Sequence, residues 1–290
     1  MTTDVRPLRE TDVDAAELVA HVSIAEMMRR YEVAPHLQGR TPERVARGRA
    51  RVRHLLGTDP GGAWAAVDGG ELVGVGLASV RGPLWFLSLL AVAPAYQGRG
   101  VGCRLLEATL GYGQGCPAGW ILASADPRAL RRYAHAGFAL HPGYEAIGTL
   151  DRGLVPSGLG VRDGDLTRDR ELIEAVAGQV RGAPHGPDLD HAAAQGLPLL
   201  VVDGAGYAFV RPDGPQVLGA RDPGSAQRLL WAVLAETTSP QVAVDWLTAA
   251  QQWAIEVVLA ARLSLHAGLS SCPRGAVGPL TPYLPSGAYG

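Results

Sequence analysis

The stretch LSLLAVAPAYQGRGVGCRLLEATL, residues 87–110, decides the fold of this chain. Its apolar beginning belongs to a run over residues 84–92, which predicts a strand buried on both faces of a sheet. A glycine turn, QGRGVG at residues 97–102, follows, and helical spacing of apolar side chains begins near Gly100. Such a turn makes an anion site, because N–H groups at a helix start point outward and glycine lets a bulky anion approach. Cys103 stands where the dinucleotide-binding fingerprint needs its third glycine, so the turn does not match that fingerprint.

Strand and helix signals alternate around this stretch. The strands predicted before residue 150 lie at residues 5–8, 63–67, 71–80, 84–92 and 119–124, and a further strand is predicted to start at Phe138. The predicted helices follow Thr11 or Asp12, lie within the Arg-rich residues 29–60, begin near Gly100, and start at Asp126-Pro127 with Gly137 at the C-terminal cap. This alternation predicts an α/β (α+β) fold, with a twisted mixed β-sheet flanked by helices.

The pattern partly repeats after a Gly- and Pro-containing linker at residues 151–160. The stretch LLVVDGAGYAFV at residues 199–210 is similar to AWAAVDGGELVGV at residues 63–75. Further strands are predicted at 216–219, 242–246 and 263–265, and helices at 226–235 and 252–261. We therefore expect two related domains, residues 1–150 and residues 151–290, of which the second is degenerate. The alternative is that any two α/β segments show such a likeness.

The glycine turn and the strand before it resemble the GNAT superfamily of N-acetyltransferases. The family hallmark is Gln or Arg, two residues, Gly, one residue, then Gly or Ala, and Gln97, Gly100 and Gly102 fit it behind the strand residues 90–94. The resemblance implies two GNAT-like domains in tandem and acetyl-CoA as acyl donor, with pantetheine on the strand backbone and pyrophosphate on the turn. By resemblance, the cofactor-binding residues are Leu90, Ala91, Val92, Gln97, Gly98, Arg99, Gly100, Val101 and Gly102.

A second element, ADPRALRRYAHAGFAL at residues 125–140, resembles the family's cofactor-side helix ending in Gly-Phe. Tyr133 lies five residues before Phe138, which by resemblance makes it the catalytic tyrosine that serves the leaving thiolate. Ordinary Tyr and Cys pKa values are about 10 and 8.5, so full proton transfer to a thiolate is uphill unless the site changes them. From periodicity alone, a core tyrosine on an apolar stripe is an equal alternative.

The sequence identifies no general base. Ser88, Glu32, His36 and Asp126 are the candidates, although Asp126 before Pro127 is best read as a helix N-cap. Positioning two bound reactants supplies much of the rate and needs no dedicated base.

The second half lacks both hallmarks. At the corresponding turn it reads GARDPGS over residues 219–225, where Asp222 would repel a pyrophosphate. No tyrosine stands at the equivalent of Tyr133, and Val258 is nearest to that place. We expect this domain to bind no acyl-CoA productively, but to cover a sheet edge of the first domain and wall the substrate cleft.

Composition excludes several function classes. The chain has no lysine, so a Walker phosphate loop and a Schiff-base lysine are excluded. Its net charge of −2 favours no nucleic-acid partner, and no apolar run reaches membrane-span length. The three cysteines are far apart, and the N-terminus lacks a signal-peptide core. We expect a cytoplasmic protein with no membrane or nucleic-acid partner, in which a homodimer is possible.

Three other features have ordinary explanations. His185, Asp188 and His191 have ligand-like spacing, but the Pro and Gly around them predict a loop, and we expect no metal. Trp246 and Trp253 are more often core than ligand-stacking residues. The tail LTPYLPSGAYG at residues 280–290 predicts an ordered extended arm that packs over the cleft, on its own domain or on a partner subunit.

These observations predict an N-acyltransferase that moves an acetyl group from acetyl-CoA to a primary amine of a small molecule or peptide by direct attack. The alternative is a non-catalytic acyl-CoA-binding module with a partner-binding second domain. A longer acyl donor is also open. Fold alone does not specify the acceptor.

Overall fold

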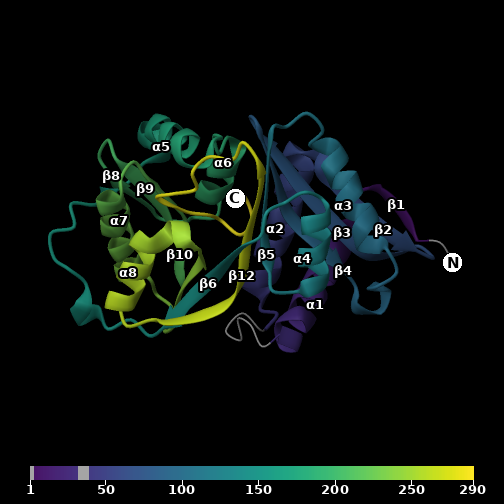
Figure 1. The fold of residues 1–290 in the computed structure, drawn as a ribbon, viewed down its shortest axis with the longest axis horizontal. Helices are drawn as coiled ribbons and strands as arrows, with labels where there is room; N and C mark the ends of the chain where they lie inside the picture. Colours follow the sequence, from purple (N-terminus) through teal and green to yellow (C-terminus); the bar gives the residue numbers. More distant parts are fainter. Residues whose placement is uncertain (1–2, 32–38) are drawn as a thin grey trace.

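The computed structural model describes residues 3–31 and 39–290. It is a mixed α/β structure with two sheets covered by helices, and the first-half and second-half elements lie on opposite sides of the view in Figure 1. The first half contains β1 (Asp4–Pro7), α1 (Val13–Tyr31), α2 (Pro42–Thr58), β2 (Ala63–Asp68), β3 (Glu71–Arg81), β4 (Leu84–Val92), α3 (Val101–Tyr112), β5 (Ala118–Ser124), α4 (Pro127–His135) and β6 (His141–Gly148).

The second half follows the same order, and its strands before β12 are mostly shorter. It contains β7 (Arg162–Asp163), α5 (Leu166–Arg181), α6 (Pro187–Ala194), β8 (Leu199–Val202), β9 (Gly206–Arg211), β10 (Gly214–Ala220), α7 (Pro223–Glu236), β11 (Val242–Leu247), α8 (Gln252–Ala260), β12 (Ser264–Gly275) and β13 (Tyr283–Leu284). The loop predicted for residues 181–191 is confirmed around His185 but wrong for Asp188 and His191, because α6 begins at Pro187. Proline suits the first helical turn, where its missing N–H would be unpaired anyway.

The first sheet has the order β1-β2-β3-β4-β5-β12-β6-β11. Strands β1 to β4 pair antiparallel, whereas β4 and β5 pair parallel across the α3 crossover. This parallel ladder is short and joins residues 84–87 to residues 118–121. Beyond it β4 and β5 separate, and the separation positions the candidate site.

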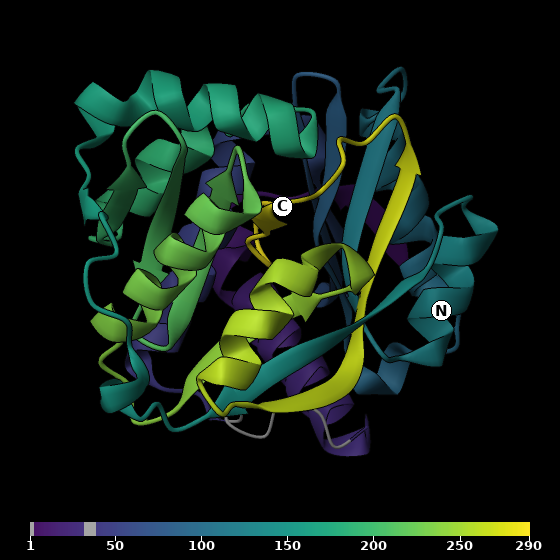
Figure 2. The ribbon, with the colours of Figure 1, turned by 60° about the vertical axis from the view of Figure 1, so that its left-hand side comes forward.

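The last long strand of the second half, β12, lies inside the first sheet. It pairs with β5, where Cys272 is opposite Ile121, and with β6, where His266 is opposite Glu145. Strand β6 pairs in turn with β11 of the second half. The two halves thus exchange strands, and Figures 1 and 2 show β6 and β12 side by side at the junction.

The second sheet has the order β13-β10-β9-β8-β7, and all its ladders are antiparallel. Helices α7 and α8 pack on one side of it around Leu229, Val233 and Val258. On its other side, Phe209 packs in one cluster with Ile173 of α5 and with Phe86 and Trp120 of the first sheet. The two halves therefore share a hydrophobic core as well as a sheet.

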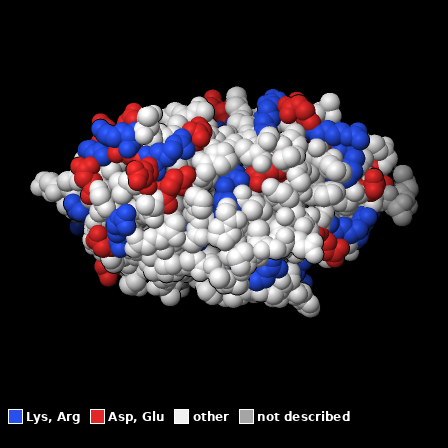
Figure 3. Space-filling model, turned by 90° about the horizontal axis from the view of Figure 1, so that it is seen from above, with Lys and Arg blue, Asp and Glu red and all other residues white. Residues whose placement is uncertain are grey.

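The fold class is confirmed: the chain is α/β (α+β), with two units of twisted sheet flanked by helices. The predicted boundary between residues 150 and 151 stays a prediction, and the strand pairing described above crosses it. On the face shown in Figure 3, arginines and acidic side chains are interspersed.

Candidate active site

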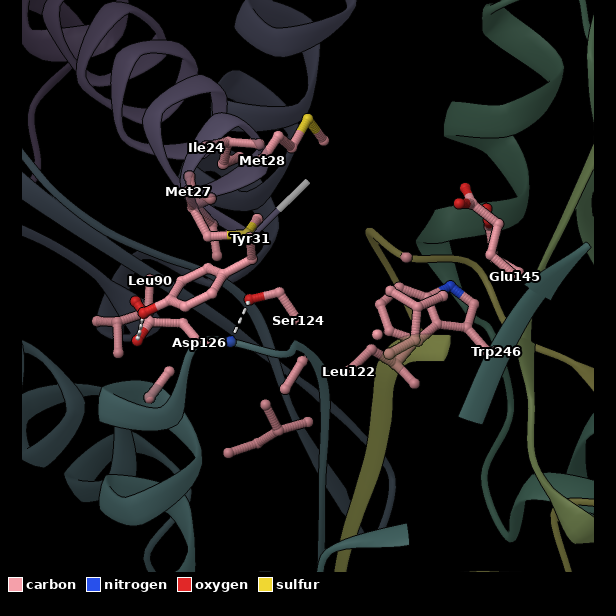
Figure 4. Close-up of a pocket in the computed structure, with 18 of the residues that line it drawn as sticks. Ile24, Met27, Met28, Tyr31, Leu90, Leu122, Ser124, Asp126, Glu145 and Trp246 are labelled. Carbon is pink, nitrogen blue, oxygen red and sulfur yellow. Dashed lines mark hydrogen bonds between the residues drawn. The ribbon is translucent and has the colours of Figure 1, made fainter. Parts of the chain in front are cut away.

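A cavity of about 1090 Å³ lies where β4 and β5 separate. Helix α1 closes one side of it, and strands β6, β11 and β12 form the opposite wall. Figure 4 shows Tyr31 and Leu90 on one side, Glu145 and Trp246 on the other, and Leu122 between them. Ligand pockets are commonly roughly 300–1,000 Å³, so this cavity has room for a thioester arm together with an acceptor.

The separation of the two strands starts at a β-bulge. Ser88 is an extra residue in β4, because Leu87 and Leu89 pair with consecutive residues of β3. A bulge bends its strand and increases the local twist. Residues 89–92 still pair with β3. The ladder between β4 and β5 ends at Leu87, so residues 89–92 have no partner in β5. Their other backbone edge therefore faces the opening, where an amide-containing ligand can hydrogen-bond to it.

Arg51 of α2 holds the bulge in place. Its Nε donates to Ser88 Oγ at 3.0 Å, and its Nη2 donates to the Ser88 carbonyl oxygen. Ser88 Oγ donates to the carbonyl oxygen of Ala288 in the tail at 2.6 Å. Burial lowers the pKa of the Arg51 guanidinium. A helix and the distant tail thus meet at the residue that opens the sheet.

The glycine turn enters α3 through left-handed backbone. Gly98 has a φ of 77°, and Gly100, the N-cap of α3, has a φ of 81°. Only glycine adopts such angles without strain. A Cβ added at either position meets nothing within 4 Å, so the space in front of the turn is open. The first N–H groups of α3 are therefore accessible to an anion.

A further cation lies beside this turn. A Cβ on Gly102 would be 2.9 Å from Nη1 of Arg132, so glycine here admits the guanidinium close to the start of α3. Arg132 also donates from Nε to Sγ of Cys103 at 3.2 Å. The sequence analysis missed Arg132, although its place one residue before Tyr133 was a usable signal.

The predicted cofactor residues occupy three different environments. Leu90 and Gln97 line the cavity, and the Gln97 side chain bridges the Val92 carbonyl and the Arg128 guanidinium, each at 2.9 Å. Ala91 is buried in a hydrophobic cluster, as is Val101 in a second cluster, against which Val92 also packs. Gly98, Arg99 and Gly100 are exposed, and Gly102 is buried.

Tyr133 lines the cavity and is only 6% exposed. Its ring packs in the same cluster as Cys272 and Phe138. Burial raises the pKa of the Tyr133 phenol above its ordinary value. The phenol therefore keeps its proton at neutral pH, so it can donate a hydrogen bond to a sulfur anion. Complete proton transfer from it is disfavoured.

The described candidates for a general base are occupied. Ser88 Oγ already donates a hydrogen bond to the Ala288 carbonyl oxygen and accepts one from Arg51. Asp126 caps α4 by accepting from the Arg128 N–H at 2.9 Å. Although burial raises the pKa of Asp126, its hydrogen bonds to Arg128 and the charge of that residue lower it overall. The other two candidates, Glu32 and His36, lie outside the described residues.

The structure brings to the cavity a carboxylate that the sequence analysis missed. Glu145 of β6 is 6% exposed and lines the wall together with Asp245 and Trp246 of β11. Burial, and then the negative charge of Asp245 and a hydrogen bond to it, raise the pKa of Glu145 to about 8. Trp246 is half-buried in the cavity wall, whereas Trp253 is a core residue as expected.

His185, Asp188 and His191 do not converge. Asp188 binds Arg81 and His54, and His185 contacts Arg181 and the Tyr207 hydroxyl. His191 stacks on His54 with ring centroids 4.3 Å apart. In the part of the chain that the structure describes, no group of metal-ligating side chains is found.

In the second half, a strand occupies the edge that opens in the first half. Strands β9 and β10 correspond to β3 and β4, so the edge of β10 away from β9 corresponds to the edge of β4 beside the cavity. That edge of β10 pairs with β13, where Leu218 and Gly219 are opposite Leu284 and Tyr283. Asp222 caps α7 at the place of the glycine turn. Both features leave no room for a pantetheine arm there.

Residues 23–144 match the model of the acetyltransferase (GNAT) family. The first half of the chain carries a GNAT domain. The match contains the bulge, the glycine turn and Tyr133, so the resemblance stated from the sequence is confirmed. This match to an acetyltransferase family supports acyl transfer as the general reaction. No curated protein sequence matches the chain.

Solved structures resemble the GNAT domain and the second half together. A Pyrococcus horikoshii protein assigned as an acetyltransferase has a TM-score of 0.79 at 16% identity, over 99% of this chain and 96% of that chain. The tandem GNAT protein from the clavulanic acid biosynthesis pathway has a TM-score of 0.60 at 16% identity, over 95% and 99%. A GCN5-related N-acetyltransferase from Kribbella flavida has 0.58 at 18% identity, over 94% and 71%. The tandem fold is therefore shared along almost the whole chain.

Within residues 3–31 and 39–290, no helix is both long enough and apolar enough to cross a membrane.

Proposed function

We propose that this protein transfers an acetyl group from acetyl-CoA to a primary amine of a small molecule or peptide by direct attack. The observation that carries the proposal is the coincidence, in one place, of the open β4 edge, the glycine turn and Tyr133. Each suits one part of a thioester of coenzyme A. The open edge suits the pantetheine amides, the turn suits the pyrophosphate, and the buried phenol suits the sulfur.

Each group in the chain has a defined task. The N–H groups of α3, together with Arg132, bind the pyrophosphate from the open side of Gly98 and Gly100. Backbone groups of residues 89–92 hold the pantetheine arm as an added strand does, so that the thioester lies in the cavity. Tyr133 donates a hydrogen bond to the departing sulfur, where negative charge develops in the transition state.

The second half acts as a wall and not as a second cofactor site. Its β10 edge is paired with β13, and its residues Gln216, Asp245 and Trp246 line the same cavity. Helix α1 contributes Ile24, Met27, Met28 and Tyr31 from the opposite side. The acceptor amine therefore binds between the two halves of the chain.

Calorimetric titration of acetyl-CoA into three proteins tests the cofactor site. Gly100→Ala and Gly100→Glu impose the same strain at a φ of 81°, and only the glutamate adds a carboxylate in front of the turn. We expect wild-type binding, modest weakening in Gly100→Ala and loss of binding in Gly100→Glu. Equal affinities in the two variants, or no binding by wild type, would contradict the assignment.

Thiol release distinguishes an enzyme from the alternative, a binding module without activity. Acetyl-CoA is mixed with the protein and a panel of primary amines, and free thiol is measured together with the acetylated product. We expect at least one amine to give stoichiometric thiol and amide. Tight binding of acetyl-CoA without turnover across the panel would favour the binding module. The second half would then have a structural role only, because its β10 edge is already paired with β13.

A further inference from the structure

Among the described residues, four arginines line the cavity, and one of them differs from the others. Three form ion pairs with carboxylates: Arg30, Arg128 and Arg211. The fourth, Arg51 of α2, donates only to Ser88, from Nε and Nη2 to the hydroxyl oxygen and from Nη2 to the carbonyl oxygen. Within residues 3–31 and 39–290, no carboxylate forms an ion pair with Arg51.

Arg51 and Arg128 lie in opposite electrostatic environments. The hydrogen bond to Asp126 is the main cause that raises the pKa of Arg128, whereas burial lowers the pKa of Arg51 and the Tyr289 phenol opposes this only in part. A guanidinium keeps its proton in proteins, so Arg51 is a cation in a place where water solvates it poorly. An anion bound beside Arg51 would therefore be stabilised, because opposite charges favour each other's ionised form.

Arg51 lies where two cavities meet. The second cavity, of about 370 Å³, lies between α1 and α2, and Arg51 and Leu89 line both cavities. Nη1 of Arg51 makes no hydrogen bond within the described residues, yet it is not an enclosed atom. A ligand in the cavity can therefore accept hydrogen bonds from Nη1 while the other two nitrogens stay on Ser88.

Ser88 fixes the place of this cation relative to the donor. It directly precedes the open edge of residues 89–92, and the glycine turn that suits the pyrophosphate follows that edge at residues 97–102. Four extended residues span about 13 Å, so Arg51 and the turn lie at opposite ends of the bound pantetheine arm. Arg51 is therefore at the thioester end. Since an acetyl group carries no charge, an anion at Arg51 comes from the acceptor.

We propose that Arg51 binds a carboxylate of the acceptor, and that the acceptor is a small amino acid whose amine and carboxylate are a few bonds apart. The inference rests on the proposed function and narrows its acceptor class. The carboxylate accepts from Nη1 while Nε and Nη2 hold Ser88, so the guanidinium that fixes the bulge also orients the amine toward the thioester. The substituent of the amino acid has room in the second cavity, whose lining includes Ala20, Ile24 and Val52.

The first test compares amino acids with their own carboxamides as acceptors for wild type. Leucine is paired with leucinamide and phenylalanine with phenylalaninamide, at equal concentrations of unprotonated amine, so that each pair differs in the charged group. We expect kcat/KM for the acid to exceed that for the amide by about tenfold or more, the size expected for a charge-assisted hydrogen bond. A ratio below about threefold for both pairs would overturn the assignment.

Arg51→Gln assigns this preference to one side chain, because it removes the charge and retains an amide N–H that can donate to Ser88. We expect the acid-to-amide ratio to fall to about one, with acetyl-CoA affinity in calorimetry unchanged. The ratio separates recognition from structure, since a displaced bulge would slow both acceptors alike. Arg53→Gln removes an exposed cation from the same helix and is the control that keeps the wild-type ratio.

Chemical modification tests the same contact without a variant. Phenylglyoxal reacts with guanidinium groups, and peptide mass spectrometry reports each arginine separately. With coenzyme A bound to wild type, leucine should slow the modification of Arg51 severalfold and leucinamide should not, whereas Arg53 should react alike in both. Equal rates at Arg51 with the two ligands would overturn the assignment, even if Arg51→Gln failed to fold.

The outcomes distinguish the two proposals and the two sources of a carboxylate. If succinyl-CoA binds wild type more tightly than acetyl-CoA and loses that advantage in Arg51→Gln, the carboxylate belongs to the acyl donor and the acceptor assignment is wrong. If wild type acetylates amines but prefers the amides, or Arg51→Gln keeps the wild-type ratio, Arg51 only holds the bulge and the acetyltransferase stands. If wild type neither binds acetyl-CoA nor releases thiol, both proposals fail.

Discussion

Tyr133 and Glu145 show how burial changes the protonation of two side chains that line the cavity. Burial disfavours the charged form of an acid, so both side chains keep their protons to higher pH than in water. For the phenol this means a permanent hydrogen-bond donor. For the carboxyl it means a pKa of about 8, raised further by the neighbouring charge of Asp245. The sequence indicated Tyr133 by motif, but no local pattern marks Glu145, because Asp245 and Arg211 come from distant strands.

The Tyr133→Phe variant tests the role of the phenol. Among the described residues its hydroxyl has no hydrogen-bond partner, so we expect the variant to fold with nearly unchanged stability. We expect kcat to fall about tenfold or more, with KM for acetyl-CoA unchanged. Each tenfold corresponds to an increase of about 1.4 kcal/mol in the activation free energy. Steady-state thiol release measures both constants. An unchanged kcat would mean that Tyr133 is only a core residue.

The raised pKa of Glu145 also predicts how stability depends on pH. Between its ordinary pKa of 4.5 and about 8, the folded protein holds a proton that the unfolded chain releases. The free energy of unfolding therefore decreases as pH rises through this window, by at most about 1.4 kcal/mol per unit.

Glu145→Gln removes this contribution, because glutamine does not titrate. We expect the variant to match wild type near pH 4 and to exceed it at pH 8.5 by roughly 1–4 kcal/mol. Urea unfolding at both pH values measures the difference. Equal stability of the two proteins at pH 8.5 would mean that the carboxyl is not perturbed in the folded state.

At the scale of elements, the sequence analysis succeeded where a pattern is local. The strands around the glycine turn and the cap at Asp126 follow from apolar spacing and cap chemistry, and each lies where it was expected. It was wrong for α6, where Pro and Gly precede the helix rather than break it. Only the first residues of β12 were predicted. Pro273 argues against a strand in the rest, because proline has no N–H to donate to a ladder. It is tolerated in β12 because the ladder with β6 ends at Ser271.

A buried ion network joins α2 and β3 to α6. Arg81, which is 5% exposed, binds Asp59 at 2.9 Å and Asp188 at 2.7 Å, and these carboxylates are 1% and 3% exposed. Arg81→Met leaves two buried carboxylates without this partner, which should cost about 3–5 kcal/mol of unfolding free energy. The matched control is Arg53→Met, which breaks an exposed pair with Glu10 and should cost less than about 1 kcal/mol.

Chemical denaturation of wild type and both variants measures these costs. A loss below about 1 kcal/mol in Arg81→Met would show that water reaches the network and that it does not hold the two halves together.

At the scale of the whole molecule, the tandem repeat was visible in the sequence, whereas the strand exchange was not. Similar stretches at residues 63–75 and 199–210 predict two similar units. Which strand lies next to β5 depends on a pairing between residues about one hundred and fifty positions apart, as between Ile121 and Cys272. No periodicity encodes that choice, because β6 and β12 each fit an antiparallel neighbour equally well by pattern. The cavity wall formed by β6, β11 and β12 was hidden for the same reason.

The exchange predicts that neither half folds alone. A chain of residues 1–150 lacks β12, so β5 and β6 lose the strand between them, and Phe86 and Trp120 lose their packing against Ile173 and Phe209. Unpaired strand edges and exposed apolar surface favour aggregation over a native sheet. Mixing separately produced residues 1–150 and 151–290 should restore a one-to-one complex, because the exchanged strands still find their partners.

Size-exclusion chromatography and hydrogen exchange at β5 measure this directly: protection at β5 should appear only in the mixture. The matched control is a chain cleaved at one site within residues 151–160, which keeps every strand and should bind acetyl-CoA like wild type. A monomeric, cooperatively folded 1–150 fragment that binds acetyl-CoA would show that β12 is dispensable. In that case the shared sheet would be a consequence of the tandem arrangement and not a requirement for the site.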